Sequence, residues 1–199
     1  MASNVSSNDK SSMVSTKIVI AGGFGAGKTT LVGSVSEIPP VTTEAMMTEA
    51  SEAHDDTSST PTKITTTVAM DFGRITLDEK LIMYMFGTPG QARFWFMWDD
   101  IVRGAVGAVV VVDVRRLADS FAAVDYFENN PQVPYIVALN RFDGELGHTV
   151  DEIREALEIR PGIPIIDFDA RDRRSAGSAL TTLLEYALSH PTKEPALAG

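Results

Sequence analysis

The sequence contains no cysteine. Disulfide bonds, thiolate catalysis, cysteine-based zinc sites and lipid attachment to cysteine are therefore excluded for this chain. Ala2 stands where N-myristoylation needs a glycine, and the polar first residues lack the apolar core of a secretory signal. The longest apolar run, at residues 105–112, is far too short to cross a bilayer. We therefore expect a cytoplasmic protein without direct membrane insertion, with membrane recruitment through partners left open.

Basic residues are scarce. The chain has 17 lysines and arginines against 27 aspartates and glutamates, which gives a formal net charge of −10. A nucleic-acid binder needs a basic surface that contacts the phosphate backbone, so we expect no nucleic-acid partner. The 199 residues, of which 44% are hydrophobic and 22% charged, suit a single globular domain with a sizeable core.

Apolar, β-branched runs alternate with helical patterns along most of the chain. Such strands are typical of a mainly parallel sheet that is covered on both faces. Two of them are separated by only two residues and are predicted to form an antiparallel hairpin. We therefore predict an α/β fold with a mostly parallel six-stranded sheet, one antiparallel edge strand, and helices on both faces. The predicted strands are residues 17–21, 65–77, 80–86, 105–114, 134–140 and 163–170.

The two ends of the chain and one internal segment lack such patterns. Residues 1–15 are rich in Ser and Asn, and we predict that they and residues 191–199 are disordered tails around one domain at residues 16–190. Residues 37–62 form a long acidic connection with no strong period, in which residues 43–53 are a candidate short helix. Loops of this length in a compact domain are usually functional or mobile.

The segment GGFGAGKT, residues 22–29, fits the phosphate-loop pattern G-x-x-x-x-G-K-[ST] between a predicted strand and a predicted helix. Its glycines allow backbone N–H groups to face phosphate oxygens, and the helix N-terminus adds partial positive charge. In such loops the lysine, here Lys28, reaches the β- and γ-phosphates, and the Thr29 hydroxyl can ligate Mg²⁺. The sequence thus predicts a P-loop NTPase three-layer fold. The predicted phosphate-binding residues are Gly22, Gly25, Ala26, Gly27, Lys28, Thr29 and Thr30.

The segment NRFD, residues 140–143, ends a predicted buried strand, where open α/β sheets bind their ligands. The Asp143 carboxylate can accept two hydrogen bonds from the N1–H and the exocyclic amine of guanine, and adenine offers neither in that geometry. We expect Asn140 to connect this loop to the phosphate loop and Arg141 to lie against the base. A plain polar turn is the alternative.

The segment DAR, residues 169–171, ends the last predicted strand. The backbone N–H of Ala170 is a candidate donor to the guanine oxygen, and Arg171 next to it is a candidate nucleotide contact. A plain turn at the end of a strand explains this segment nearly as well.

In this order, GGFGAGKTT, TVAMDF, TPGQARF, RGAVGAVVVVDV, NRFD and DAR resemble the Ras superfamily of small GTPases over roughly residues 16–190. TVAMDF is similar to the Rab switch I pattern T-I-G-V-D-F, and GQARF to the Rab pattern G-Q-E-R-F. The chain more closely resembles the bacterial Ras-like proteins encoded in actinobacterial conservons. These small gene sets also encode a roadblock-type protein. It is more distantly similar to the gliding-motility GTPase of myxobacteria.

The resemblance implies roles for three further residues. Thr67 is expected to ligate Mg²⁺ from switch I, with Thr65 and Thr66 making its position uncertain by one or two residues. Gly90 is expected to offer its N–H to the γ-phosphate, and Gln91 to orient the attacking water, which makes Gln91 and Lys28 the expected catalytic residues. The implied cofactors are GTP, GDP and Mg²⁺.

Three residues depart from the family pattern. Gly87 replaces the aspartate of D-x-x-G, which in the family holds Mg²⁺ through water, so weaker Mg²⁺ binding is expected. Arg141 replaces the usual lysine of N-K-x-D. Phe24 is bulky where the family has a small residue, and it either packs under a neighbouring loop or blocks an arginine finger or the attacking water. No arginine is evidently placed to act within the chain.

The run FWFMW, residues 94–98, is too apolar to face the core entirely from a helix predicted at residues 91–104. Exposed aromatic residues of this kind mark partner surfaces, although switch I packing over them is an alternative. The resemblance suggests a roadblock-type partner at this run and switch I. We expect a GTP/GDP switch with slow Mg²⁺-dependent hydrolysis. The alternatives are a scaffold that does not hydrolyse nucleotide and an ATP-binding P-loop protein that uses Asp113 as its acid.

Overall fold

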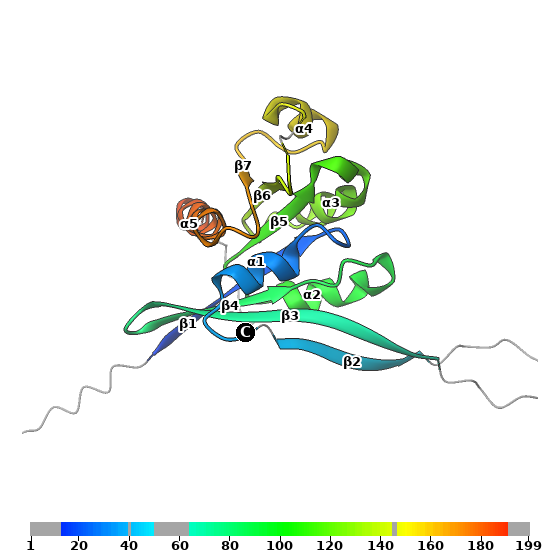
Figure 1. The fold of residues 1–199 in the computed structure, drawn as a ribbon, viewed down its shortest axis with the longest axis vertical. Helices are drawn as coiled ribbons and strands as arrows, with labels where there is room; N and C mark the ends of the chain where they lie inside the picture. The colour runs from blue at the N-terminus through cyan, green and yellow to red at the C-terminus, as the bar shows by residue number, and fades with distance from the viewer. Residues whose placement is uncertain (1–12, 40, 50–63, 145–146, 191–199) are drawn as a thin grey trace, which may run out of the picture.

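A computed structural model describes residues 13–39, 41–49, 64–144 and 147–190 (Figure 1). The predictions for residues 1–12, 50–63 and 191–199 lie outside the described residues. The strands are β1 (Val14–Gly22), β2 (Val41–Glu49), β3 (Ile64–Asp78), β4 (Leu81–Gly87), β5 (Gly107–Asp113), β6 (Tyr135–Asn140) and β7 (Ile165–Phe168). The α-helices are α1 (Lys28–Val35), α2 (Trp98–Val102), α3 (Phe121–Asn129), α4 (Val150–Ala156) and α5 (Arg173–Ser189), and 3-10 helices span η1 (Ala92–Met97) and η2 (Val114–Ser120).

The strands form one sheet in the order β2-β3-β4-β1-β5-β6-β7. β4, β1, β5, β6 and β7 pair in parallel, whereas β3 is antiparallel to both β4 and β2. All six predicted strands are present, and the predicted mostly parallel P-loop NTPase fold is confirmed.

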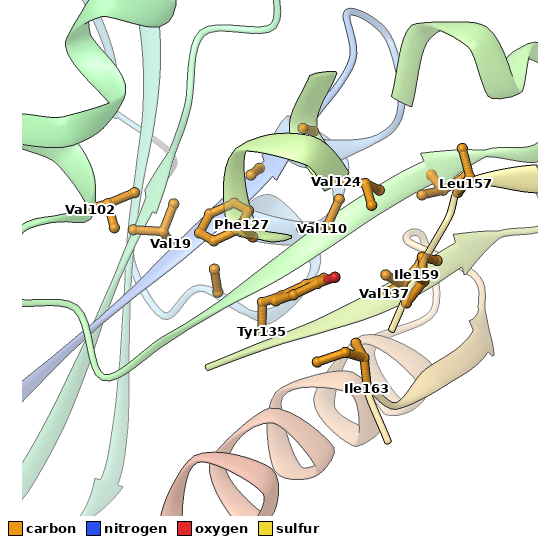
Figure 2. Close-up of a cluster of buried hydrophobic side chains, with 14 of the residues drawn as sticks. Val19, Val102, Val110, Val124, Phe127, Tyr135, Val137, Leu157, Ile159 and Ile163 are labelled. Atoms are coloured by element: carbon orange, nitrogen blue, oxygen red, sulfur yellow. The ribbon is translucent and has the colours of Figure 1, made fainter. Parts of the chain in front are cut away.

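Helices cover both faces of the sheet, because every second side chain of a strand points to the same face. One buried cluster joins strand valines such as Val19 and Val110 to α2, α3 and α4, and Figure 2 shows Phe127 of α3 beside Tyr135 of β6 in this cluster. The other cluster packs Ile18 and Ile20 of β1 against α1 and α5. β5 and β6 are buried at every position, as their unbroken apolar sequences predict.

The structure differs from the prediction in three respects. A seventh strand, β2, lies outside β3, so β3 is not the edge strand as predicted. β2 and β3 form an arm that extends past the rest of the sheet in Figure 1. Residues 43–49 of the candidate short helix belong to β2, since β3 offers an unpaired edge for hydrogen bonding. Val14 and Ser15, predicted to be in a disordered tail, pair with Leu81 and Ile82 in the sheet.

The hairpin of β3 and β4 contains a bulge. Asp78 pairs with Leu81, but Thr76 pairs with Ile82, which leaves Leu77 as an extra residue on β3. An extra residue shifts all later pairs by one and changes which side chains face each other. Further along, Phe72 pairs with Phe86, so the next position places Asp71 across from Gly87.

The aromatic run is divided between the core and the surface. Residues 92–97 form the 3-10 helix η1 and only Trp98–Val102 are α-helical, so the predicted single helix is wrong. Phe94 and Trp98 are buried, whereas 41% of Trp95 and 63% of Phe96 are exposed. The Trp98 ring stays in the core because its indole N–H donates to the Pro89 carbonyl at 3.2 Å. No helix in the described part of the chain has the length and apolar character to span a bilayer.

Candidate functional site

A cleft of about 360 Å³ lies where β1 ends and α1 begins, and it also reaches Asp71 in the middle of β3 and Thr88 directly after β4. This is the edge of the sheet at which open α/β proteins bind ligands. The cleft is lined by Phe24, Gly25, Gly27, Lys28, Thr29, Thr30, Asp71, Thr88 and Gly90. Most of the predicted phosphate-binding residues are therefore brought together. Ala26 is buried instead and supports the loop from behind.

Lys28 is the buried cation of the cleft. Its ammonium donates hydrogen bonds to the carbonyls of Gly22 and Gly23 at 2.9 and 2.7 Å, across the phosphate loop. Burial lowers the pKa of Lys28 to about 8, and the charge of Asp71 acts in the opposite direction. A phosphate bound here would supply the negative charge that keeps this lysine protonated.

Asp71 is a cleft residue that the sequence analysis missed. It lies on β3 with 8% of its surface exposed, and its carboxylate accepts a 2.7 Å hydrogen bond from the Thr29 hydroxyl. A Cβ at Gly87 would lie 2.9 Å from the Asp71 Cβ, so the glycine leaves space for this side chain. The register of the β3–β4 hairpin was the available signal, but the bulge at Leu77 hides it from sequence patterns.

The oxygen atoms near Thr29 suit a magnesium ion bound together with phosphate. Mg²⁺ prefers hard oxygen ligands and usually takes one or two carboxylates, with phosphate and water completing its shell. Thr29 and Asp71 supply such oxygens, and the buried Thr88 hydroxyl next to them has no hydrogen-bond partner among the described residues. No cluster of three or more His, Cys, Asp or Glu in the described residues could hold a metal by itself. A metal here would therefore depend on a bound phosphate.

Asn140 connects the phosphate loop to the strand ends next to it, as predicted. Its amide donates to the Ala26 carbonyl at 3.0 Å, and its side-chain oxygen accepts from the Ala170 N–H at 3.2 Å. Gly27 has a φ of 111°, and a Cβ there would lie 2.4 Å from the Asn140 amide nitrogen. The expected role of Ala170 is corrected, because its N–H is used by Asn140 rather than directed at a base.

The residues predicted to contact a base lie at an exposed end of the site. Asp143 accepts a 2.5 Å hydrogen bond from Arg171, whose guanidinium also contacts Asp169 and the Phe142 carbonyl. The Asp143 side chain is 84% exposed. Arg141 forms an ion pair with Asp167 of β7, and its predicted contact with a base stays a prediction.

The switch residues inferred from the resemblance differ in position. Gly90 contacts the phosphate loop so closely that a Cβ would lie 2.8 Å from the Lys28 ammonium. Gln91 is exposed, does not line the cleft, and accepts a 2.9 Å hydrogen bond from Arg93. Thr67 lies on β3 four residues before Asp71, and its role as a metal ligand stays a prediction.

Phe24 and Arg116 form the outer rim of the phosphate loop. Phe24 is 66% exposed and lines the cleft, so none of the described loops packs over it. Its carbonyl accepts a 3.0 Å hydrogen bond from Arg116, which also forms ion pairs with Asp113 and Asp119. Arg116 therefore lies against the phosphate loop, and the expectation that no arginine of the chain acts in hydrolysis stays a prediction.

Asp113 is buried at the end of β5, but it does not line the cleft. It forms ion pairs with Arg115 at 2.8 Å and Arg116 at 3.4 Å. The hydrogen bond from Arg115 holds the pKa of Asp113 below its ordinary value, against the effect of burial. Because its carboxylate is already used by two arginines, Asp113 is a poor candidate for the acid of an ATPase.

A family model described as "conserved hypothetical ATP binding protein" matches residues 20–190. The chain belongs to this family. It is 28% identical over 129 residues to an uncharacterized protein of Methanocaldococcus jannaschii, covering 64% of this chain and 70% of that protein. It is 26% identical to a Ypt/Rab-type GTPase of Gibberella zeae, covering 59% of this chain and 63% of that protein. It is 28% identical to the Ras-related protein SEC4 of Saccharomyces cerevisiae, covering 59% of each.

Among solved structures, the G-domain of FeoB from Methanococcus jannaschii superposes with a TM-score of 0.56. The sequences are 14% identical, and the match covers 89% of this chain and 99% of that one, which shows a shared fold. Through this shared fold and the Rab and Ras-related relatives, the chain is similar to Ras-like P-loop GTPases. Similarity to the conservon proteins in particular stays a prediction.

Proposed function

We propose that this P-loop protein is a small GTP-binding switch that alternates between GTP- and GDP-bound states and signals through a protein partner. The observation that carries the proposal is the bridge made by Asn140. It holds the phosphate loop in a fixed position relative to the loop that ends in Asp143. One site therefore has a cradle for phosphates at one end and an exposed carboxylate for a base at the other.

The choice of guanine follows from the chemistry of Asp143. A carboxylate accepts two hydrogen bonds from the N1–H and the exocyclic amine of guanine, whereas adenine presents no such pair of donors. The family description names ATP, which makes an ATP-binding protein the second candidate. The arginine-paired Asp113 and the exposed Asp143 favour guanine over that candidate.

The switch itself would act through Gly90. Because Gly90 lies against Lys28 and the Phe24 backbone, a γ-phosphate at Lys28 would contact switch II directly and order it. Thr67 would bring switch I to the same phosphate. A Mg²⁺ ion bound at Thr29 would neutralise phosphate charge during hydrolysis. Slow turnover follows from Gln91, which is hydrogen-bonded to Arg93 on the surface and must turn inward to orient water.

The exposed rings of Trp95 and Phe96 supply a surface on which a partner can read this state. The run is coupled to switch II, since the buried Trp98 donates to the carbonyl of Pro89, the residue before Gly90. We propose that a roadblock-type dimer binds this run together with switch I. Aromatic residues that are exposed in the free protein and buried in a complex are frequent sources of binding energy.

The direct test measures binding of GTP, GDP and ATP to the full chain, with and without Mg²⁺, and follows phosphate release. We expect GTP and GDP to bind more tightly than ATP, with slow release of phosphate. Preferential binding of ATP would contradict the switch proposal and favour an ATP-binding protein. Tight GTP binding without any hydrolysis, even with a roadblock-type partner present, would favour a scaffold.

Replacing Asp143 by alanine tests the base-reading end alone. Loss of two charged hydrogen bonds of roughly 1.5–3 kcal/mol each, about 3–6 kcal/mol together, should reduce the preference for GDP over ADP by at least about 100-fold. Binding of ADP should stay unchanged, since the phosphate cradle is intact. Asp151→Ala, an exposed aspartate in the first turn of α4, is the control. Full guanine preference in Asp143→Ala would show that another residue reads the base.

A further inference from the structure

Gly87 stands at the position where the D-x-x-G pattern has an aspartate. Asp71, on the neighbouring strand β3, places a carboxylate beside the same position. We infer that Asp71 on β3 is the residue that organises Mg²⁺ in this protein, in place of a carboxylate at position 87. The inference rests on the proposed nucleotide-binding function and names the metal-organising residue of that site.

The first support is the steric relation between the two positions. Gly87 is not among the glycines with a positive φ, so its backbone conformation would accept any side chain. The requirement for glycine comes instead from space. A Cβ at this position would lie 2.9 Å from the Asp71 Cβ and 3.1 Å from one carboxylate oxygen. Asp71 and a second aspartate at position 87 therefore exclude each other.

The second support is the hydrogen bond from Thr29. The Thr29 hydroxyl donates its only proton to Asp71 at 2.7 Å, which leaves the lone pairs of its oxygen free to bind a cation. Carboxylates that hold a metal ligand in this way fix its orientation and strengthen metal binding. Asp71 also lines the cleft itself, so its second oxygen is available to a water molecule on the metal.

The third support is electrostatic. Asp71 is buried, with 8% of its surface exposed, and it forms no salt bridge with any described residue. The Lys28 ammonium acts on Asp71 only at longer range and donates to the Gly22 and Gly23 carbonyls instead. A buried carboxylate without a direct ion pair is costly, because it has lost its hydration. Asp113, the comparably buried acid at the end of β5, is paired with two arginines. A divalent cation bound next to Thr29 would place positive charge beside Asp71, as the two arginines do beside Asp113.

The experiment measures the release of fluorescent GDP from the full chain in Mg²⁺ and in excess EDTA, together with Mn²⁺ binding to the GDP complex by electron paramagnetic resonance. Asp71→Asn keeps the size of the side chain and an acceptor for Thr29, but it removes the charge. We expect Mn²⁺ affinity to fall about 10- to 100-fold, and the slowing of GDP release by Mg²⁺ to be lost to a similar extent. Asp78→Asn, the same change at the far end of β3, should behave as wild type.

The exchange variant Asp71→Gly/Gly87→Asp moves the acid to β4 and removes the Cβ with which it would collide. We expect it to recover Mn²⁺ affinity relative to Asp71→Asn. Asp71→Ala/Gly87→Asp keeps the colliding Cβ and should not recover it. Wild-type Mn²⁺ affinity and wild-type slowing of GDP release by Mg²⁺ in Asp71→Asn would overturn the inference. This holds even if the variant melts at a lower temperature, because Asp71 would then have a structural role only. A folded exchange variant without recovery would overturn it too.

Should Asp71→Asn fail to fold, a crystal structure of the wild type with GDP and Mg²⁺ decides. An Asp71 carboxylate that contacts neither the cation nor its water ligands would overturn the inference. The measurements are repeated with ADP, which separates the two proposals. If ADP binds and GDP does not, the guanine assignment fails and Asp71 is tested in the ADP complex. If neither nucleotide binds, both proposals are overturned.

Discussion

The two ends of the proposed nucleotide site are built in different ways. At the phosphate end, Lys28, Asp71 and Asn140 are all buried. Lys28 and Asn140 donate hydrogen bonds to backbone carbonyls of the phosphate loop, and Asp71 accepts one from the Thr29 hydroxyl. At the base end, Asp143 and Arg171 form an ion pair with 84% and 53% of their side chains exposed. Burial fixes the first set before a ligand arrives, whereas solvent screens the second.

This difference separates affinity from selectivity. Phosphates carry most of the charge of any nucleotide, and a buried, prearranged cradle binds them without further loss of side-chain freedom. In the proposed function, the base would be chosen by the exposed Asp143 carboxylate, whose partner Arg171 would have to be shared or displaced when guanine binds. We therefore expect changes at the phosphate end to alter stability and binding of all nucleotides, and changes at the base end to alter preference alone.

The largest effect is expected for Asn140→Ala. The substitution leaves the Ala26 carbonyl and the Ala170 N–H without their partner in the interior. At about 1–3 kcal/mol for each of the two unsatisfied groups, the free energy of unfolding should fall by roughly 2–6 kcal/mol. Urea unfolding measures this loss, and binding of GDP and ADP should weaken together.

The matched control is Asn129→Ala, since Asn129 is exposed and bonds only within α3. Its stability should stay within about 0.5 kcal/mol of wild type. If Asn140→Ala lost guanine preference while keeping its stability, Asn140 would act in base recognition rather than in holding the phosphate loop. The contrast between the two ends would then be wrong.

Much of the phosphate end could be predicted from the sequence, because its contacts are local. The glycines, Lys28 and Thr29 lie within eight consecutive residues between a strand and a helix, and short motifs of this kind need no tertiary information. Asn140 was also predicted, since the ends of parallel strands meet at one edge of the sheet. The strand and helix alternation likewise indicated the parallel sheet.

Asp71 and Arg116 were missed because each depends on geometry over a long range. The position of Asp71 depends on a one-residue bulge at Leu77, which no hydrophobic pattern reveals. Arg116 contacts Phe24 across 92 residues of sequence. The strand β2 was missed because its sequence, VTTEAMMTE, alternates poorly and gains its hydrogen bonds only from β3.

A smaller effect is expected for Arg171→Ala. The Arg171 guanidinium holds one oxygen of Asp143 and so limits the directions in which the carboxylate can point. Without it, we expect guanine preference to fall about two- to five-fold, much less than in Asp143→Ala, because the ion pair is exposed. Competition binding of GDP against ADP measures this change, with exposed Arg174→Ala as the control.

Tighter binding of GDP by Arg171→Ala would reverse the interpretation. In that case the guanidinium competes with guanine for the carboxylate and must be displaced, so the base end would be closed in the free protein rather than prepared for its ligand.

The smallest effects, and the finest comparison, are expected for two adjacent arginines of η2. Arg116 donates to the Phe24 carbonyl at the phosphate end, whereas Arg115 lies over the Phe142 ring, 3.6 Å from its centroid, next to the base end. Both share Asp113, so either variant leaves that acid with one partner. We expect Arg116→Ala to weaken GDP and ADP binding equally, by about two- to three-fold, since an exposed contact contributes below about 1 kcal/mol.

Arg115→Ala should leave ADP binding unchanged and reduce the preference for GDP to a similar small extent, because the Phe142 backbone directs Asp143, the next residue. Titrations of each variant with both nucleotides measure the two ratios. Equal loss of GDP and ADP binding in both variants would mean that η2 supports the cleft as one unit. The two ends would then be coupled through Asp113, and the division between affinity and selectivity would hold only at the residues that contact the ligand.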